Sequence, residues 1–230
     1  MDRHFVSFPK SGRSWLRYAL TQLGVADKIF FHHDGFEYND RARLPLDFNY
    51  VARFEKYNQR NRVVYLYRDP RDVMVSFFYQ ITGRFADIFN FDGTISEFIR
   101  DPYFGAENLQ RFRCLWAALC KTGCALAISY ESCHADFQFV LSTVVRHYGL
   151  DVNENDIAAA AKLSTYEHMK RVEDSGEFGH PWLQRRNGKP KLRRGRIGDF
   201  TEEFTAADID YLTSIFGTAP LASAKWNNSR

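Results

Sequence analysis

The chain has 230 residues, of which 45% are hydrophobic and 26% are charged. This composition is typical of a soluble globular protein and excludes collagen-like, low-complexity and wholly disordered chains. The net charge of +3 hides a local concentration of positive charge, because seven of the 31 basic residues and no acidic residue lie within residues 185–196. The rest of the chain has 24 basic and 28 acidic residues. This pattern indicates one concentrated anionic ligand, and no nucleic-acid partner is expected.

Strand and helix patterns alternate along the chain. Short apolar runs bounded by polar or turn residues predict strands at 3–8, 28–31, 62–67 and 124–129. Helical periodicity predicts helices at 12–23, 70–82, 106–121 and 134–148. Thr205 and Asp208 have the spacing of a capping box and predict a last helix that ends at Phe216. This alternation predicts an α/β fold with three layers (α/β/α), in which helices cover both faces of a central parallel sheet.

The length suits a single domain over residues 1–230. No stretch approaches the roughly 18 to 20 apolar residues that a membrane span needs. Asp2, Arg3 and Lys10 leave no apolar segment for a signal peptide. We therefore expect a cytoplasmic protein with no integral membrane association. The four cysteines form no C-x-x-C pair, so neither disulfides nor a metal site is expected.

The first motif, P-K-S-G-R-S-W at residues 9–15, follows a predicted strand and opens a helix. Backbone amides at such a turn point outward with the positive end of the helix dipole, and Lys10, Ser11 and Ser14 add further donors. The motif is not a Walker A loop, because Lys10 precedes the only glycine, Gly12. It predicts a compact site for a phosphate-like anion.

The second motif, Y-R-D-P-R-D-V-M-V-S at residues 67–76, is again a strand that enters a helix. Asp69 is a good N-cap, Pro70 suits the first helical position, and Asp72 is predicted to complete a capping box. Arg68 has no such structural explanation. An arginine at the carboxyl end of a strand is well placed for bidentate phosphate binding, and Ser76, two turns down the helix, could add a hydroxyl.

The third motif, R-R-G-R-I-G-D-F at residues 193–200, alternates arginines with glycines that let backbone amides approach a ligand closely. It lies at the end of the segment 172–198, which is rich in Gly, Pro and basic residues and has no clear periodicity. Such a segment is too long for a passive connector. We predict a mobile lid that closes over a bound phosphate.

The three motifs in this order resemble the sulfotransferases that use 3′-phosphoadenosine 5′-phosphosulfate (PAPS), whose fold is related to that of P-loop nucleoside triphosphate hydrolases. The resemblance implies that the first motif binds the 5′-phosphosulfate, while later residues bind the 3′-phosphate and the adenine. The cofactor contacts that it implies are Lys10, Ser11, Gly12, Arg13, Ser14, Trp15, Arg68, Ser76, Tyr130, Thr165, Tyr166, Arg193, Arg194 and Gly195. The catalytic candidates are Lys10, His33 and Ser76. No metal is implied.

The implied reaction is in-line attack by an acceptor hydroxyl or amine on sulfur, with Lys10 neutralising the phosphate that leaves. His33 is the positional match for a family histidine that accepts the proton, and an unperturbed imidazole suits that task near neutral pH. The family context T-H-L-P is replaced here by F-H-H-D-G at residues 31–35. His32 and Glu37 therefore stay open as alternative bases.

Another departure is the pair Arg13 and Ser14, which stands where the family more often has two threonines and brings a cation near the sulfuryl group or the acceptor. The acceptor itself stays open among a small hydroxylated molecule, a sugar and a lipid headgroup. Two alternatives to a sulfotransferase are a P-loop-like kinase, which would bind ATP with Mg²⁺, and an inactive relative that binds the nucleotide without turnover.

Overall fold

The computed structural model of the protein describes residues 1–36, 46–58 and 61–217. Its centre is a sheet of four parallel strands in the order β2-β1-β3-β4. The strands are β1 (Arg3–Ser7), β2 (Phe30–His32), β3 (Arg62–Tyr67) and β4 (Leu126–Ser129). In register, Phe5 of β1 pairs with Phe31 and Val64, and Leu66 of β3 pairs with Ile128. All carboxyl ends therefore lie along one edge of the sheet.

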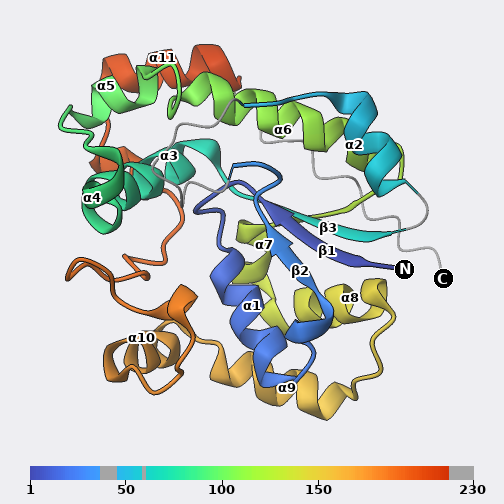
Figure 1. Cartoon of the computed structure of the whole chain (residues 1–230). Coiled ribbons are helices and arrows are strands. Elements are labelled where there is room, and N and C mark those ends of the chain that lie inside the picture. The colour runs from blue at the N-terminus through green and yellow to red at the C-terminus, as the bar shows by residue number, and fades with distance from the viewer. Residues whose placement is uncertain (37–45, 59–60, 218–230) are drawn as a thin grey trace.

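Helices cover both faces of the sheet (Figure 1). Their bounds are α1 (Arg13–Gln22), α2 (Tyr50–Tyr57), α3 (Pro70–Tyr79), α4 (Ala86–Phe89), α5 (Ile95–Arg100), α6 (Ala106–Lys121), α7 (Tyr130–Ala135), α8 (Phe137–Tyr148), α9 (Glu154–Leu163), α10 (Tyr166–Ser175) and α11 (Ala206–Phe216). The predicted three-layer α/β/α fold is thereby confirmed.

The period of two along the strands divides the core into two layers. On one face, Val6 and Tyr65 pack with residues of α3, α6 and α11 around the fully buried Trp116. On the other face, Phe5 and Leu66 pack with residues of α1, α8 and α9. A smaller cluster joins α10 to α1 through Met169 and Tyr18. Both faces of the sheet are thus buried, as parallel strands require.

Several predicted boundaries are wrong, for local reasons. The strand predicted at 28–31 begins at Phe30, because residues 26–28 form a 3-10 turn. The helix predicted at 134–148 is interrupted at Asp136, whose extended backbone lets its carboxylate accept from the N–H of Phe139 and cap α8. The helix predicted to end at 82 leaves α geometry after Tyr79 and continues as a π-helical turn, Gln80–Arg84.

For the other elements, some predictions from local sequence patterns are confirmed and some helices were not predicted. Thr205 and Asp208 form the expected capping box at the start of α11, which ends at Phe216 as predicted. The segment 172–198 begins inside α10 and also contains a 3-10 turn, Pro181–Leu183, so it is not wholly irregular. The shorter helices α2, α4 and α5 were not predicted, and neither were α9 and α10. Among the described residues, no helix has both the length and the apolar character to cross a membrane.

Candidate active site

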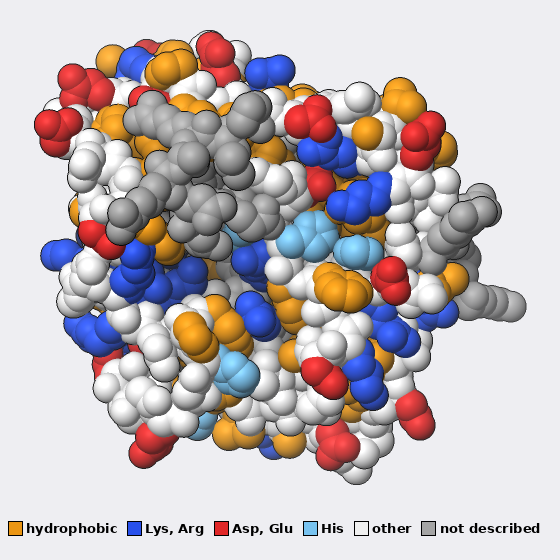
Figure 2. All heavy atoms as spheres, viewed as in Figure 1, with side chains coloured by type: hydrophobic (Ala, Val, Ile, Leu, Met, Phe, Trp, Pro, Cys, Tyr) orange, Lys and Arg blue, Asp and Glu red, His pale blue; other side chains and the backbone are white. Residues whose placement is uncertain are grey.

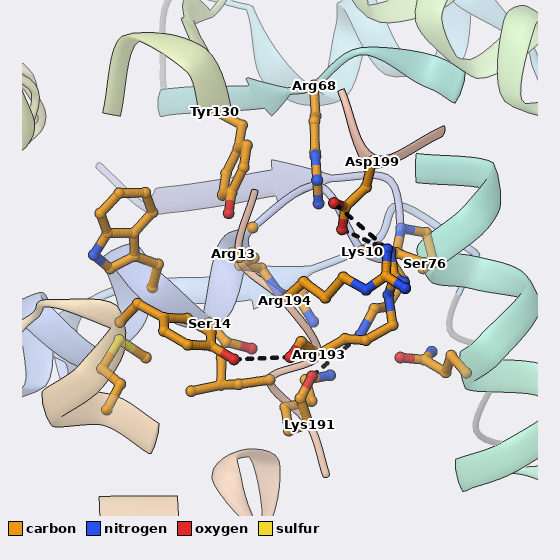
Figure 3. Close-up of a pocket in the computed structure, with 18 of the residues that line it drawn as sticks. Lys10, Arg13, Ser14, Arg68, Ser76, Tyr130, Lys191, Arg193, Arg194 and Asp199 are labelled. Atoms are coloured by element: carbon orange, nitrogen blue, oxygen red, sulfur yellow. Dashed lines mark hydrogen bonds and ion pairs between the residues drawn. The ribbon is translucent and has the colours of Figure 1, made fainter. Parts of the chain in front are cut away.

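A pocket opens at the carboxyl ends of β1, β3 and β4, and the segment 191–195 lies along it (Figure 3). Figure 2 shows lysine and arginine side chains gathered around the hollow on this face of the molecule. The residues that line it are Pro9, Lys10, Gly12, Arg13, Ser14, Trp15, His33, Arg68, Ser76, Gln80, Tyr130, His134, Tyr166, Met169, Lys191, Leu192, Arg193, Arg194, Gly195 and Asp199. Ligands of open parallel α/β sheets bind at the carboxyl ends of the strands, and the pocket lies there.

The loop between β1 and α1 is a compact turn built on two left-handed residues, Lys10 (φ 70°) and Gly12 (φ 101°). The N–H of Ser11 donates to the carbonyl of Phe8 at 3.3 Å, which closes the turn. The N-cap residue of α1 is Gly12, which has no side chain to cap the helix, and the first turn of α1 holds no acidic residue. The positive end of this helix is therefore left for an anion.

Gly12 also makes room for the aromatic ring of Tyr130. A Cβ at this position would lie 2.4 Å from Cδ2 of Tyr130, and the positive φ disfavours any side chain. We expect Gly12→Ala to displace this ring at a cost of about 1–3 kcal/mol in stability. It should also weaken, at least about 10-fold, the binding of adenosine 3′,5′-bisphosphate (PAP), the product of the cofactor that the motif resemblance implies. Calorimetric titration and thermal unfolding measure the two effects. Gly24→Ala is the control, because Gly24 also has a positive φ but its Cβ would meet no atom within 4 Å.

Lys10 is the loop's cation. Its Nζ donates to the carbonyl oxygen of Lys191 at 3.4 Å. Burial, followed by the nearby charges of Arg84 and Arg68, lowers the pKa of Lys10 to about 7. A neighbouring anion would favour the protonated form, so binding of a phosphate here is coupled to protonation of Lys10.

Arg68, at the end of β3, is 7% exposed and held on several sides. Its Nη2 donates to the carbonyl of Arg196 at 2.7 Å and lies 3.4 Å from Oδ2 of Asp72. Its guanidinium lies over the ring of Tyr130, with 4.3 Å from Cζ to the ring centroid. Ser76, on the adjoining helix α3, lines the same pocket (Figure 3). The guanidinium is therefore pre-oriented in a pocket that Ser76 also lines.

The capping box predicted at α3 is wrong in part. Asp69 caps the helix by accepting from the N–H of Arg71, as expected. The N–H of Asp69 is bound by Glu131 of α7, at 2.9 Å. Asp72 accepts from the N–H groups of Gly198 and Phe200, at 2.8 and 3.1 Å. Asp72 thus anchors the third motif against the second, a contact between distant segments.

The third motif forms one wall of the pocket. Arg193 makes ion pairs with Asp199 at 3.0 Å and Glu203 at 3.2 Å, and Arg194 pairs with Glu202 at 2.7 Å. The hydroxyl of Tyr166 donates to the carbonyl of Arg193 at 2.7 Å. These contacts hold both arginines along the pocket, where each pairs with Asp199 (Figure 3).

An aromatic group completes the pocket. The indole of Trp15 stacks on Phe137 at 4.5 Å and 4°, and its Nε1 donates to the carbonyl of Ser164 at 2.6 Å. His134 packs edge-on against both Trp15 and Tyr130, at 4.9 and 4.7 Å between ring centroids. Rings held this firmly suit a planar base at the pocket wall.

His33 has one defined tautomer. Its Nδ1 lies 2.6 Å from the carbonyl oxygen of Ser7, and its Nε2 lies 2.8 Å from Nη2 of Arg13. A carbonyl only accepts and a guanidinium only donates, so Nδ1 carries the proton and Nε2 is the basic nitrogen. Burial, and then the charge of Arg13, lowers the pKa of His33 well below its usual value. The imidazole is therefore neutral, and both His33 and Arg13, which contacts its basic nitrogen, line the pocket.

Three of the sequence candidates do not line the pocket. Ser11 is buried within the turn, and Thr165 is exposed and caps α10 by accepting from the N–H of His168. His32 lies against His4, with 3.2 Å between Nδ1 of His4 and Nε2 of His32. Burial and the charge of His4 lower the pKa of His32 to about 3. Glu37 lies outside the described residues.

The sequence reading also missed pocket residues. Gln80 lies one turn after Ser76, so helical spacing could have indicated it. Lys191 belongs to the basic segment, but nothing in that segment's pattern distinguishes it from its neighbours. In the described part of the chain, no group of three or more His, Cys, Asp or Glu side chains could hold a metal ion.

Comparisons with known proteins give a consistent result. The family model described as "Sulfotransferase domain" matches residues 2–225. An amine sulfotransferase from Oryctolagus cuniculus is 22% identical over 94% of this chain and 79% of its own length. Sulfotransferase 2B1 from Mus musculus is 24% identical over 94% of this chain and 70% of its own.

Solved structures show the same fold. Mouse sulfotransferase SULT7A1, solved in complex with PAP, superposes with a TM-score of 0.69 at 20% identity, covering 96% of this chain and 86% of that one. Retinol dehydratase, solved with androsterone and PAP, gives a TM-score of 0.61 at 17% identity, covering 93% and 78%. Because the family model spans nearly the whole chain, the protein belongs to the sulfotransferase family.

Proposed function

We propose that the protein transfers a sulfuryl group from PAPS to a hydroxyl or amine of an acceptor. One observation carries this proposal: a single pocket joins the anion-binding turn at Lys10, the arginines of the second and third motifs, and a group of aromatic rings. PAPS has a matching set of parts, namely a phosphosulfate, a separate 3′-phosphate and an adenine. The PAP complexes of the structural relatives support the same donor.

Each group then has a chemical task. Lys10 and the amides at the start of α1 stabilise the negative charge that develops on the departing 5′-phosphate. Arg68, Arg193, Arg194 and Ser76 bind the 3′-phosphate, far from the reacting sulfur, so their interaction energy serves recognition and orientation. Nε2 of His33 takes the proton of the acceptor, once Arg13 has moved from its present contact with that nitrogen.

A calorimetric titration with PAP, with ATP plus Mg²⁺ as the comparison, tests the donor. We expect PAP to bind and Mg²⁺–ATP to bind at least about 100-fold more weakly, since the 3′-phosphate contacts are worth about 2–5 kcal/mol. Preference for Mg²⁺–ATP would indicate the kinase alternative. Binding of PAP without transfer of ³⁵S from labelled PAPS to any acceptor would indicate an inactive relative.

The role of His33 leads to a prediction of its own. His33→Gln is expected to lower kcat by about 10²–10⁴ and to leave the Kd for PAP within about twofold, because only proton transfer is lost. Since the pKa of His33 is lowered in the folded protein, the acid limb of the wild-type kcat/KM profile should lie below pH 6.5, where the base becomes protonated. His32→Gln is the control, and an equal loss in this variant would contradict the assignment.

The remaining proposals concern the setting of the reaction. We propose one sulfotransferase domain over residues 1–230, supported by the family match to residues 2–225. We propose a small molecule as acceptor, in line with the names of the curated relatives, among them amine and steroid sulfotransferases. Arg185 and Arg186 pair with Asp174 and Asp87, which supports the absence of a nucleic-acid partner. A cytoplasmic location stays a prediction from the sequence.

A further inference from the structure

Asp199 is an acidic residue in a pocket that is proposed to bind phosphates. It is 4% exposed and lines the pocket, although a carboxylate there should repel a bound phosphate. The carboxylate bridges two arginines, because Oδ2 lies 3.0 Å from Nη2 of Arg193 and Oδ1 lies 3.8 Å from Nη1 of Arg194 (Figure 3). The proposed sulfuryl transfer gives this side chain no chemical task of its own.

The backbone around Asp199 is fixed by a second carboxylate. The N–H groups of the residues before and after Asp199 donate to Asp72 at 2.8 and 3.1 Å. Asp72 is itself 1% exposed and lies 3.4 Å from Nη2 of Arg68. One buried carboxylate thus connects Arg68 to the turn that carries Asp199, and Asp199 connects this turn to the two arginines of the third motif. All three arginines proposed for the 3′-phosphate therefore belong to one network.

The carboxylates of this network pair with the Nη nitrogens of the arginines. In Arg193, Nη2 pairs with Asp199 and Nη1 pairs with Glu203 at 3.2 Å. In Arg68, Nη2 faces Asp72. In the part of the chain that the structure describes, the buried Nε–H groups of Arg68 and Arg193 have no acceptor. Since buried donors are rarely left unpaired, a bound ligand is expected to supply the acceptor.

We infer that Asp199 is a positioning residue, which holds Arg193 and Arg194 in the orientation in which they bind the 3′-phosphate. This inference rests on the proposed function and specifies how the cofactor site recognises that phosphate. An arginine that is already ordered loses little rotamer freedom on binding, whereas a free arginine must be ordered at the expense of binding energy. This gain exceeds the repulsion between Asp199 and the phosphate, because the two arginines already neutralise the carboxylate.

The experiment measures how much the 3′-phosphate contributes to binding. Calorimetric titration gives the Kd values for PAP and for adenosine 5′-monophosphate (AMP), which lacks that phosphate. In the wild type, the ratio of the AMP Kd to the PAP Kd should be about 100 or more. Asp199→Asn removes the charge with little change of shape, and Asp199→Glu keeps the charge but displaces it. Each should lower the ratio about 10-fold, because the phosphate must then order two arginines itself.

The AMP Kd of both variants should stay within about twofold of the wild-type value, because AMP has no group for these arginines. Asp174→Asn is the matched control: Asp174 pairs with an arginine of the basic segment, Arg185, at 2.9 Å, but lies outside the pocket lining. It should leave the ratio within about twofold.

Three results would overturn the inference. One is an unchanged ratio in both Asp199 variants. Another is a higher ratio in Asp199→Asn, which is expected if the carboxylate only repels the phosphate. The third is an equal loss of AMP and PAP affinity, or of all binding, in both variants, which would show that Asp199 only supports the fold. Failure of the proposed function is distinguishable, because the wild-type protein itself would then not prefer PAP to AMP.

Discussion

Replacing Arg68 with alanine is expected to raise the Kd for PAP by about 100-fold or more. The proposed 3′-phosphate would lose a guanidinium that is 7% exposed and already oriented by Tyr130 and the carbonyl of Arg196. Removing one partner of a buried, hydrogen-bonded charge pair costs about 2–5 kcal/mol, much of it because the other charge is left without a partner. Calorimetric titration of the purified variant measures the change.

Arg71→Ala is the matched control for this experiment. Arg71 is also an arginine at the start of α3, but it pairs with Asp69 at 2.6 Å and lies over Phe200. Its loss should leave PAP affinity within about threefold. Because Arg68 also pairs with the buried Asp72, thermal unfolding must accompany the titration. A folded Arg68→Ala protein that binds PAP as the wild type does would place the 3′-phosphate elsewhere.

Replacing Lys10 with methionine is expected to lower kcat by about 10²–10³, the usual effect of removing one group that stabilises charge in the transition state. Affinity for PAP should fall much less, because the arginines that face the 3′-phosphate remain. Single-turnover measurements with labelled PAPS separate this loss from binding. Lys162→Met serves as the control, since Lys162 is an exposed lysine of α9.

The lowered pKa of Lys10 leads us to expect that PAP binding depends on pH. Its pKa is lowered to about 7 without a ligand, and a bound anion raises it, so PAP binding takes up a proton above pH 7. The wild-type Kd for PAP should therefore rise between pH 7 and pH 9, and this rise should be smaller in Lys10→Met. An unchanged kcat in Lys10→Met, or a flat wild-type profile, would contradict the assignment.

Local patterns predicted the layers of the fold and the place of the pocket. Strand and helix periodicities alternate clearly enough to give a parallel sheet, and parallel strands bring their carboxyl ends to one edge. The helix starts at Asp69 and Thr205 were also readable, because a capping side chain bonds to amides only two or three residues away. The sequence pattern did not predict the break between α7 and α8 at Asp136, because an aspartate at that position also fits within a helical pattern.

The chain's own sequence thus determined the α/β class and the three motifs that are proposed to bind the phosphates, because these depend on residues close together along the chain. Only the tertiary structure decided the partners of the functional groups. It joined Asp72 to Gly198, placed Arg13 on Nε2 of His33 and directed Lys191 to the same pocket. These contacts link residues brought together by packing, and their energies depend on burial and neighbouring charge. No local pattern encodes either quantity.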